Sequence, residues 1–457
     1  MRILLLTPGT GHFFCGSCLR DDALRRALTG LGHDVTVAPL YLPLVLEEPE
    51  GELPVHMGGI NMYLQQKSPG LARWMPRWLT DRLDHPGVLR WAARRGSMTE
   101  ARDLGEMTLS MLRGEEGQQS LEVEKLVTWA AATNPRPDVI VLSNVMLSGI
   151  ARRLRQELPG TAIVATLQGE APFLDGLPEP FAGQAWRTLI ERTADLDAMI
   201  AVSHYYAEHM RQKLQLPAER IQVVHNGIDP RDFPKTPRPL AERTPPTIGF
   251  LARMCEDKGL GRLVQAFAQL KRRGSVEGLR LHVAGVMLRE DQTYVDRMRR
   301  TLQDASCLDD AQFSPNITRA EKLAFLSSCR ALSVPSTCGE AFGLFVLEAL
   351  AAGVPVVQPQ HGAFPELIEA TRGGLLCAAD DPKGEALADA LEQLFLDPPR
   401  AQDLADHGHR AVHARFSAER MAEEFAAVCS MAARVQSTQS RISHEPCPTP
   451  PPRRSSG

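Results

Sequence analysis

Short runs of apolar residues alternate along most of the chain with longer stretches in which apolar residues recur at helical spacing. This alternation is typical of parallel sheets covered by helices, and it predicts an α/β fold of the doubly wound kind. Val55–Leu64 could add a strand or two. The main strands are expected at Ile3–Thr7, Val35–Ala38, Val139–Leu142, Ile163–Thr166, Met199–Val202, Ile221–Val224, Thr247–Phe250, Leu281–Ala284, around Phe313, Ala331–Val334 and Pro355–Gln358.

Two stretches interrupt the alternation. Residues 230–246 are rich in Pro and poor in apolar runs, so a domain boundary is expected near Arg238 to Pro246. After an amphipathic helix at Ser417–Val435, residues 436–457 consist mainly of Ser, Thr, Pro and Arg. That segment lacks the apolar residues needed to bury a core, and we expect it to be disordered.

Composition narrows the class of protein. The 457 residues allow two or three domains, and a net charge of −4 from 51 basic and 55 acidic residues argues against a nucleic-acid partner bound through overall charge. No window approaches the roughly 20 apolar residues of a membrane span, and the N-terminal apolar run is too short for a signal peptide. Nine Cys without disulfide-like spacing favour a reduced, cytoplasmic setting.

The Gly-rich loop after the first strand is not a dinucleotide fingerprint. Gly9 and Gly11 are followed by a misplaced third Gly, and the second strand ends in Pro39–Leu40 where an acid should bind a ribose. A nicotinamide dehydrogenase is therefore disfavoured. The loop also holds a CxxC, Cys15 to Cys18, for which small-residue packing is favoured over a redox or metal role.

The most informative stretch runs from Ser333 to Glu366. A strand passes through a Gly/Ser/Thr loop into an apolar helix, and a second strand then leads through Gly362–Ala363 into another helix. Helix N-termini favour anions. Glu340 and Glu348 frame the first turn, roughly 12 Å apart if the segment is helical throughout. An anion cradle between two hydroxyl-accepting carboxylates suits a sugar nucleotide.

These residues resemble family 4 glycosyltransferases, which are retaining enzymes of the GT-B fold. Glu340 and Glu348 stand in a Glu-x7-Glu spacing followed by AlaLeuAlaAlaGlyValProVal, with a GlyAlaPheProGlu turn in register. Arg253 and Lys258, five residues apart after a strand, match the family's donor-diphosphate clamp, although two surface cations would look similar. Gly16 occupies the second position of the family's Gly-Gly pair, where Cys15 is a departure.

The resemblance implies two Rossmann-like doubly wound domains facing across a cleft. The acceptor domain would span 1–238, with a helical insertion near 65–130, and the nucleotide-sugar donor domain would span 239–415. The helix at 416–435 would return to the first domain. Donor binding would then belong to the second domain and acceptor binding to the first.

The resemblance also implies roles for individual residues. Glu340 would hold the sugar hydroxyls with help from the backbone N–H groups of Phe342, Gly343 and Leu344, and Glu348 would accept from the ribose. Arg253, Lys258 and Gly16 would bind the diphosphate, with the backbone of Gly362 and Ala363 nearby. No obvious nucleophile is present, which fits front-face displacement of a hexose onto a hydroxyl acceptor. No catalytic metal and no cofactor beyond the donor substrate are expected.

The acceptor side is less well marked. Gln168 stands where family members often carry His, and Glu170 and Asp175 follow in a polar loop. Residues 71–95 combine Trp with several Arg, which indicates either peripheral contact with an anionic membrane at the inner face or, preferably, a helical insertion over the acceptor cleft.

Two other readings of the sequence stay open. One is a sugar-nucleotide epimerase or phosphorylase of the same fold. The other is a non-enzymatic or redox-regulated binding protein that uses Cys15 and Cys18. The presence of Glu348, Arg253 and Lys258 together favours an intact donor site and therefore an enzyme.

Overall fold

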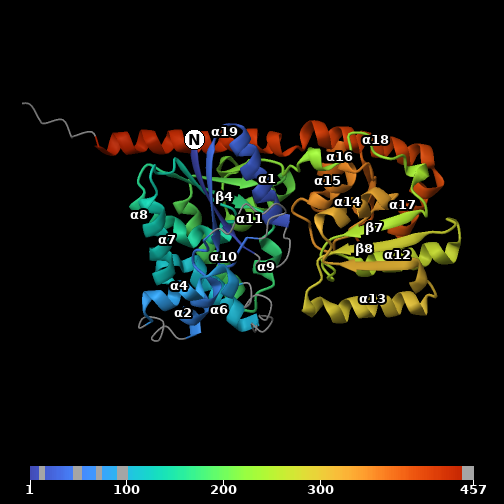
Figure 1. The fold of residues 1–457 in the computed structure, drawn as a ribbon, viewed down its shortest axis with the longest axis horizontal. Helices are drawn as coiled ribbons and strands as arrows, with labels where there is room; N and C mark the ends of the chain where they lie inside the picture. Colours follow the sequence, from blue (N-terminus) through green and yellow to red (C-terminus); the bar gives the residue numbers. More distant parts are fainter. Residues whose placement is uncertain (10–15, 45–53, 68–74, 90–100, 445–457) are drawn as a thin grey trace, which may run out of the picture.

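The computed structural model describes residues 1–9, 16–44, 54–67, 75–89 and 101–444. Two lobes lie side by side, and each is built around a six-stranded sheet (Figure 1). Every strand pair in both sheets is parallel. The predicted pair of doubly wound domains is therefore confirmed.

The first sheet has the order β2-β1-β3-β4-β5-β6. Its central strands are buried on both faces, as their uninterrupted apolar runs predict. The strands are β1 (Arg2–Pro8), β2 (Asp34–Leu40), β3 (Val139–Leu142), β4 (Ala162–Leu167), β5 (Ala198–Ala201) and β6 (Ile221–Val223).

Helices cover this sheet and form the predicted insertion. They are α1 (Gly16–Gly30), α2 (Gly59–Lys67), α4 (Arg77–Leu83), α6 (Ala101–Arg113), α7 (Ser120–Ala132), α8 (Ala151–Glu157), α9 (Ala171–Asp175), α10 (Phe181–Arg192) and α11 (His204–Leu214). The strand expected within Val55–Leu64 is wrong: only an isolated bridge joins Leu40 to His56, and α2 follows. Asn61, Met62 and Gln65 are buried together there, a helical spacing rather than an alternating one.

The second sheet has the order β12-β11-β10-β7-β8-β9. Its strands are β7 (Thr247–Leu251), β8 (Arg280–Gly285), β9 (Ala311–Pro315), β10 (Ala331–Leu332), β11 (Val356–Pro359) and β12 (Gly374–Cys377). Its helices are α12 (Leu260–Arg273), α13 (Gln292–Asp304), α14 (Arg319–Ser328), α15 (Leu344–Ala351), α16 (Phe364–Thr371), α17 (Glu385–Leu396) and α18 (Pro398–Arg415).

The strand order of the second sheet reverses between β10 and β7. Doubly wound sheets bind ligands beside such a reversal, outside the carboxyl ends of the strands. The loops that leave β7 and β10 both start at this edge, and they carry Lys258 and Glu340. The topology therefore brings together two residues that are far apart in the sequence.

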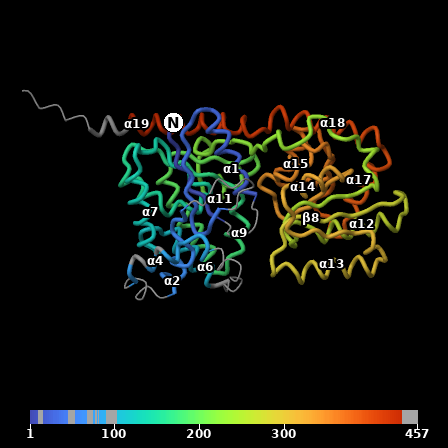
Figure 2. Tube along the Cα trace, in the orientation of Figure 1, coloured from blue at the N-terminus to red at the C-terminus, as the bar shows by residue number. Residues whose placement is uncertain are grey.

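Helix α19 (Ala418–His444) leaves the second domain and crosses the first, where it packs against α1 and β4 (Figures 1 and 2). Phe425 and Cys429 on its inner face are fully buried. The return of this helix to the first domain fits the resemblance. The prediction of disorder from residue 436 is wrong for residues 436–444, which belong to α19. Between Ala418 and His444 the sequence contains no Pro or Gly that would end the helix, and the first Pro after Ala418 is Pro446. Residues 445–457 lie outside the described part.

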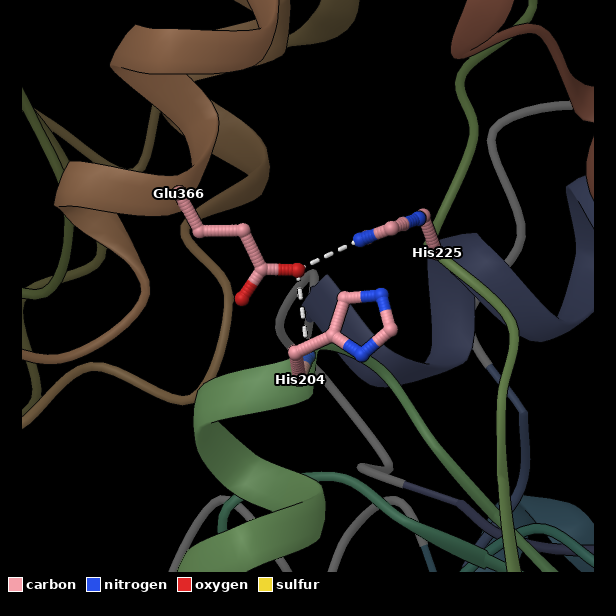
Figure 3. A group of neighbouring side chains, drawn as sticks. All are labelled: His204, His225 and Glu366. Atoms are coloured by element: carbon pink, nitrogen blue, oxygen red, sulfur yellow. Dashed lines mark hydrogen bonds and ion pairs between the residues drawn. The ribbon is translucent and has the colours of Figure 1, made fainter.

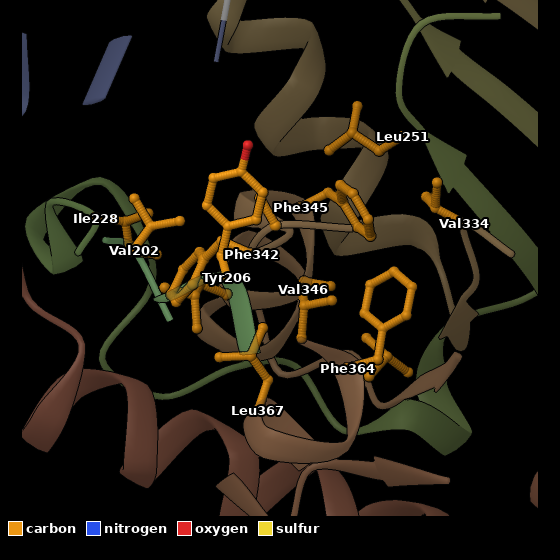
Figure 4. Close-up of a cluster of buried hydrophobic side chains, with 14 of the residues drawn as sticks. Val202, Tyr206, Ile228, Leu251, Val334, Phe342, Phe345, Val346, Phe364 and Leu367 are labelled. Atoms are coloured by element: carbon orange, nitrogen blue, oxygen red, sulfur yellow. The ribbon is translucent and has the colours of Figure 1, made fainter. Parts of the chain in front are cut away.

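Apolar side chains of both domains meet in one cluster (Figure 4). Val202, Tyr206 and Ile228 of the first domain lie near Phe342 and Leu367 of the second, and all five are less than 10% exposed. Because burying this surface stabilises the contact between the domains, the loop that carries Glu340 is held from both sides.

Candidate active site

Glu340 and Lys258 form the centre of the candidate site. The Lys258 Nζ lies 2.6 Å from Glu340 Oε2, and the Ser336 hydroxyl donates to the same oxygen at 3.4 Å. The Glu340 side chain is 16% exposed and that of Lys258 is 31% exposed. Burial would lower the pKa of Lys258, but the adjacent Glu340 carboxylate holds it above its ordinary value. A lysine cation therefore stands at the predicted sugar-binding carboxylate.

Three helix N-termini surround this pair. α12 follows Lys258 directly after Gly259, α15 begins after Gly343, and α16 begins after Ala363. Gly343 and Gly259 both have left-handed φ angles, of 96° and 73°, which L side chains rarely adopt. Helix N-termini favour an anion, so this edge of the sheet is suited to a diphosphate, although the Gly261 and Ala363 N–H groups already donate to the Tyr294 hydroxyl and the Glu340 carbonyl.

The turn at Gly362 fits closely against Glu340. Its φ is 62°, and a Cβ on Gly362 would lie 2.6 Å from the Glu340 backbone nitrogen. The Ala363 N–H donates to the Glu340 carbonyl at 2.9 Å. The structure therefore brings Gly362 and Ala363 to Glu340, as the predicted site requires.

Gly362→Ala is expected to displace the Glu340 loop. The new methyl group would meet backbone atoms, which cannot rotate away, so transferase activity should fall about tenfold or more through misplacement of the site. Gly274→Ala is the matched control, since Gly274 has a φ of 66° and no atom within 4 Å of the added Cβ. Both variants would carry similar backbone strain. Equal activity losses in the two would contradict the proposed steric role of Gly362.

Glu348 lies on α15 with an ion-pair partner of its own. Lys322 Nζ, on α14, lies 2.7 Å from Glu348 Oε1. Helix α15 begins only at Leu344, so the roughly 12 Å separation expected for a wholly helical segment does not apply. Lys322 was not predicted; the scarcity of Lys, eight in the chain, was the only available signal.

Arg253 is paired with carboxylates of the segment that follows β8. Its Nε donates to Asp291 Oδ2 at 2.9 Å and its Nη2 donates to Asp291 Oδ1 at 3.0 Å, while Glu290 also accepts from Nη2. Asp291 is buried and follows β8. Arg253 would have to exchange these carboxylates for a phosphate, so its role as a clamp stays a prediction.

Gly16 approaches the donor domain from across the cleft. It opens α1, and a Cβ on it would lie 3.8 Å from Leu344 Cδ1 at the start of α15. Gly16, predicted to bind the diphosphate, therefore lies close to Leu344, predicted to help hold the sugar. Cys15 lies outside the described residues. Cys18 is buried with its thiol on the Pro8 carbonyl at 3.3 Å, which fits packing.

The loop after β4 is organised by Glu170. This buried carboxylate accepts from the N–H groups of Gln168 and Gly169, at 2.8 and 3.1 Å, and from the Tyr206 hydroxyl at 3.0 Å. Burial raises the pKa of Glu170. A Cβ on Gly169 would lie 3.4 Å from Ala341, so this loop faces the donor loop. Glu170 thus supports the loop, while the Gln168 side chain donates to the Thr166 hydroxyl at 3.2 Å and its acceptor-side role stays a prediction.

Asp175 lies in an ion pair near the end of α11. It pairs with Lys213 at 2.7 Å and accepts from the Trp186 indole at 2.9 Å. Lys213 is near the end of α11, and the start of that helix, at His204, faces the donor domain. Nine helical residues separate the two ends by roughly 13 Å. The structure shows Asp175 in an exposed ion pair on the first domain, and its acceptor-side role stays a prediction.

Several hydrogen bonds cross between the domains. Glu366 on α16 accepts from the backbone N–H groups of His204 and Tyr205, at 3.0 and 3.1 Å, and its Oε1 lies 2.6 Å from His225 Nε2 (Figure 3). The Ser203 hydroxyl donates to the Ala341 carbonyl at 2.6 Å. The carboxylate and hydroxyl thereby fasten the start of α11 to the donor domain. No sequence signal marked Glu366, although it ends the GlyAlaPheProGlu turn.

Part of the basic stretch at 71–95 lies outside the described residues, so membrane contact there stays a prediction. Helices α4, α6 and α7 lie in the segment where a helical insertion was expected. Among the helices that the structure describes, none combines the length and hydropathy needed to cross a bilayer.

Comparison with known sequences identifies the family of the chain. Residues 232–411 match the family described as glycosyl transferases group 1, and residues 111–232 match Glycosyltransferase Family 4. The two matches together run through both domains and include Lys258, Glu340 and Glu348. The chain therefore belongs to these glycosyltransferase families.

Individual relatives are similar over part of their length. A GDP-mannose-dependent alpha-(1-6)-phosphatidylinositol monomannoside mannosyltransferase of Mycobacterium tuberculosis is 27% identical over 52% of this chain and 63% of its own. A D-inositol 3-phosphate glycosyltransferase of Pseudarthrobacter chlorophenolicus is 30% identical over 58% of this chain and 64% of its own. Matches thus span about half to two thirds of the curated relatives.

Solved structures agree in fold. Sucrose-phosphate synthase from Thermosynechococcus elongatus has a TM-score of 0.68 at 18% identity, covering 95% of this chain and all (100%) of that one. Anabaena HepE, in complex with UDP and glucose, has a TM-score of 0.65 at 18% identity, covering 94% and 99%. At this identity the likeness establishes the GT-B architecture alone.

Proposed function

We propose that this enzyme transfers a hexose from a nucleoside diphosphate sugar to a hydroxyl acceptor with retention of anomeric configuration. The observation that carries the proposal is the Lys258–Glu340 pair at the strand-order reversal, with three helix N-termini around it. A cation and helix N-termini would bind the diphosphate, and the carboxylate would accept from sugar hydroxyls.

Electrostatics would do most of the catalytic work. Negative charge builds on the diphosphate as it departs, and Lys258 and the helix N-termini are already in place to stabilise it. The loops at Gln168 and Glu340 would bring the acceptor hydroxyl and the anomeric carbon together. The departing phosphate would help to remove the acceptor proton, which needs no protein nucleophile and no catalytic metal.

The class of donor gains support from relatives and neighbours. HepE structures contain UDP or UDP-glucose, and one relative's name specifies GDP-mannose. The shared chemistry is a nucleoside diphosphate joined to a hexose, whereas the base differs among these proteins. The acceptor class is proposed as a glycan, lipid or small molecule with a free hydroxyl, handled on the cytoplasmic side.

Glu348→Gln tests the ribose contact. Replacing a charged acceptor by an amide weakens hydrogen bonds that are worth about 1.5–3 kcal/mol each, so the donor KM should rise about 10- to 100-fold with a smaller change in kcat. Initial-rate kinetics with the preferred donor give both constants. Glu369→Gln, on the exposed side of α16, is the matched control. An unchanged donor KM in Glu348→Gln would remove Glu348 from the donor site.

A further inference from the structure

His204, His225 and Glu366 gather three nitrogen and oxygen ligands between the domains. One atom from each side chain lies within 4.8 Å of the other two. The two imidazole rings have centroids 5.6 Å apart and both stand beside the Glu366 carboxylate (Figure 3). Two ligands come from the first domain and one comes from the second, so an ion held here would bridge them.

The His204 ring is not explained by the hydrogen bonds that fasten the domains. Its backbone N–H donates to Glu366, but within the described ranges no hydrogen bond to its ring nitrogens is found. The residue opens α11 and its side chain is exposed, so neither packing nor capping requires an imidazole there. A role as a further metal ligand beside His225 and Glu366 would explain the imidazole at this position.

We propose that these three side chains bind Zn²⁺, with water in the fourth position. Imidazole and carboxylate are zinc ligands at about 2.0–2.2 Å, and a tetrahedral ion spaces its ligand atoms roughly 3.4 Å apart. Small side-chain rotations would bring the three ligand atoms from their present separations, all within 4.8 Å, to this tetrahedral spacing. The ion takes the place of the proton between His225 Nε2 and Glu366, and neutral His225 then carries its proton on Nδ1. Glu366 supplies one negative charge to the site.

Bound zinc would hold the two domains in the arrangement seen here. An ion that joins α16 to the start of α11 would resist separation of the domains and would slow any turnover step that needs that separation. This consequence rests on the proposed function, whereas zinc binding itself does not. The site is regulatory in this account and takes no part in sugar transfer.

Zinc binding is measured without substrate, by competition with a chromophoric chelator on the full-length chain after removal of metal. Wild type is expected to bind one zinc ion per chain with low-micromolar affinity or better. His204→Ala should lose this binding while keeping every interdomain hydrogen bond, because Glu366 accepts from the backbone of His204. His407→Ala, on the surface of α18, should bind as wild type does.

A substitution of Glu366, the ligand supplied by the second domain, tests whether the ion bridges the two domains. Glu366→Gln should lose the same ion, and Co²⁺ in place of Zn²⁺ should show the visible bands of a tetrahedral site in wild type only. No stoichiometric zinc in wild type, or zinc binding that persists in His204→Ala, would overturn the proposal. Unchanged affinity in Glu366→Gln would overturn the bridge. None of these outcomes depends on whether the chain transfers a hexose.

Discussion

Lys258→Ala is expected to lower kcat/KM about 100- to 1,000-fold, the range found when one preorganised donor to developing charge is removed. The loss has two parts. The cation that would stabilise the departing diphosphate is gone, and Glu340, only 16% exposed, loses its ion-pair partner at 2.6 Å. A freed Glu340 carboxylate is expected to turn toward water and to leave the sugar-binding position.

Kinetics of transfer and a thermal unfolding curve check this result together. Lys383→Ala is the control, because Lys383 is exposed in the loop before α17. The control should keep wild-type rates, and Lys258→Ala should keep the fold. Rates within about twofold of wild type in Lys258→Ala would show that charge at this position is not used in transfer.

Asp21→Ala is expected to destabilise the first domain by about 3–5 kcal/mol, the cost of leaving a buried charge unpaired. Asp21 accepts from Arg20 Nη1 at 2.9 Å and from the Thr7 hydroxyl at 2.7 Å. Arg20 also donates to Asn226 at 3.0 Å and stacks over Phe425, 5.5 Å from the ring centroid. The pair therefore joins β1, α1, the segment after β6 and α19 in one buried network.

The free energy of unfolding is measured by urea titration with a probe of the first domain, since a two-domain chain need not unfold in one step. Asp34→Ala, at the exposed start of β2, should change stability by no more than about 0.5 kcal/mol. A loss below about 1 kcal/mol in Asp21→Ala would mean that Arg20 finds other partners or water when its carboxylate is removed.

Strands were predictable because a strand buried on both faces leaves an unbroken apolar run. Val139–Leu142 matches β3 at both ends. The order of apolar and polar residues in Val55–Leu64 was misleading. A short run of mixed residues with Gly is compatible with either a helix or a strand, and only the buried positions distinguish the two.

The sequence indicated individual candidate residues of the site, but it did not indicate which of them form ion pairs with one another. Glu340 and Lys258 were both identified, yet their contact depends on β10 lying beside β7, which spacing along the chain does not encode. The same is true of Lys322 with Glu348 and of Arg253 with Asp291. Long-range ion pairs follow from sheet order and loop geometry, and local sequence carries no record of either.

The measurement that tests the central claim most directly is thermal stabilisation of the purified protein by a panel of nucleoside diphosphates and their sugars, without added metal. Selective binding to the folded state stabilises it by about 2.7 kcal/mol at a ligand concentration 100 times the dissociation constant. The account predicts a rise in melting temperature with one nucleotide class, and its loss in Lys258→Ala. No rise with any member of the panel would contradict a nucleotide-sugar site at Lys258 and Glu340.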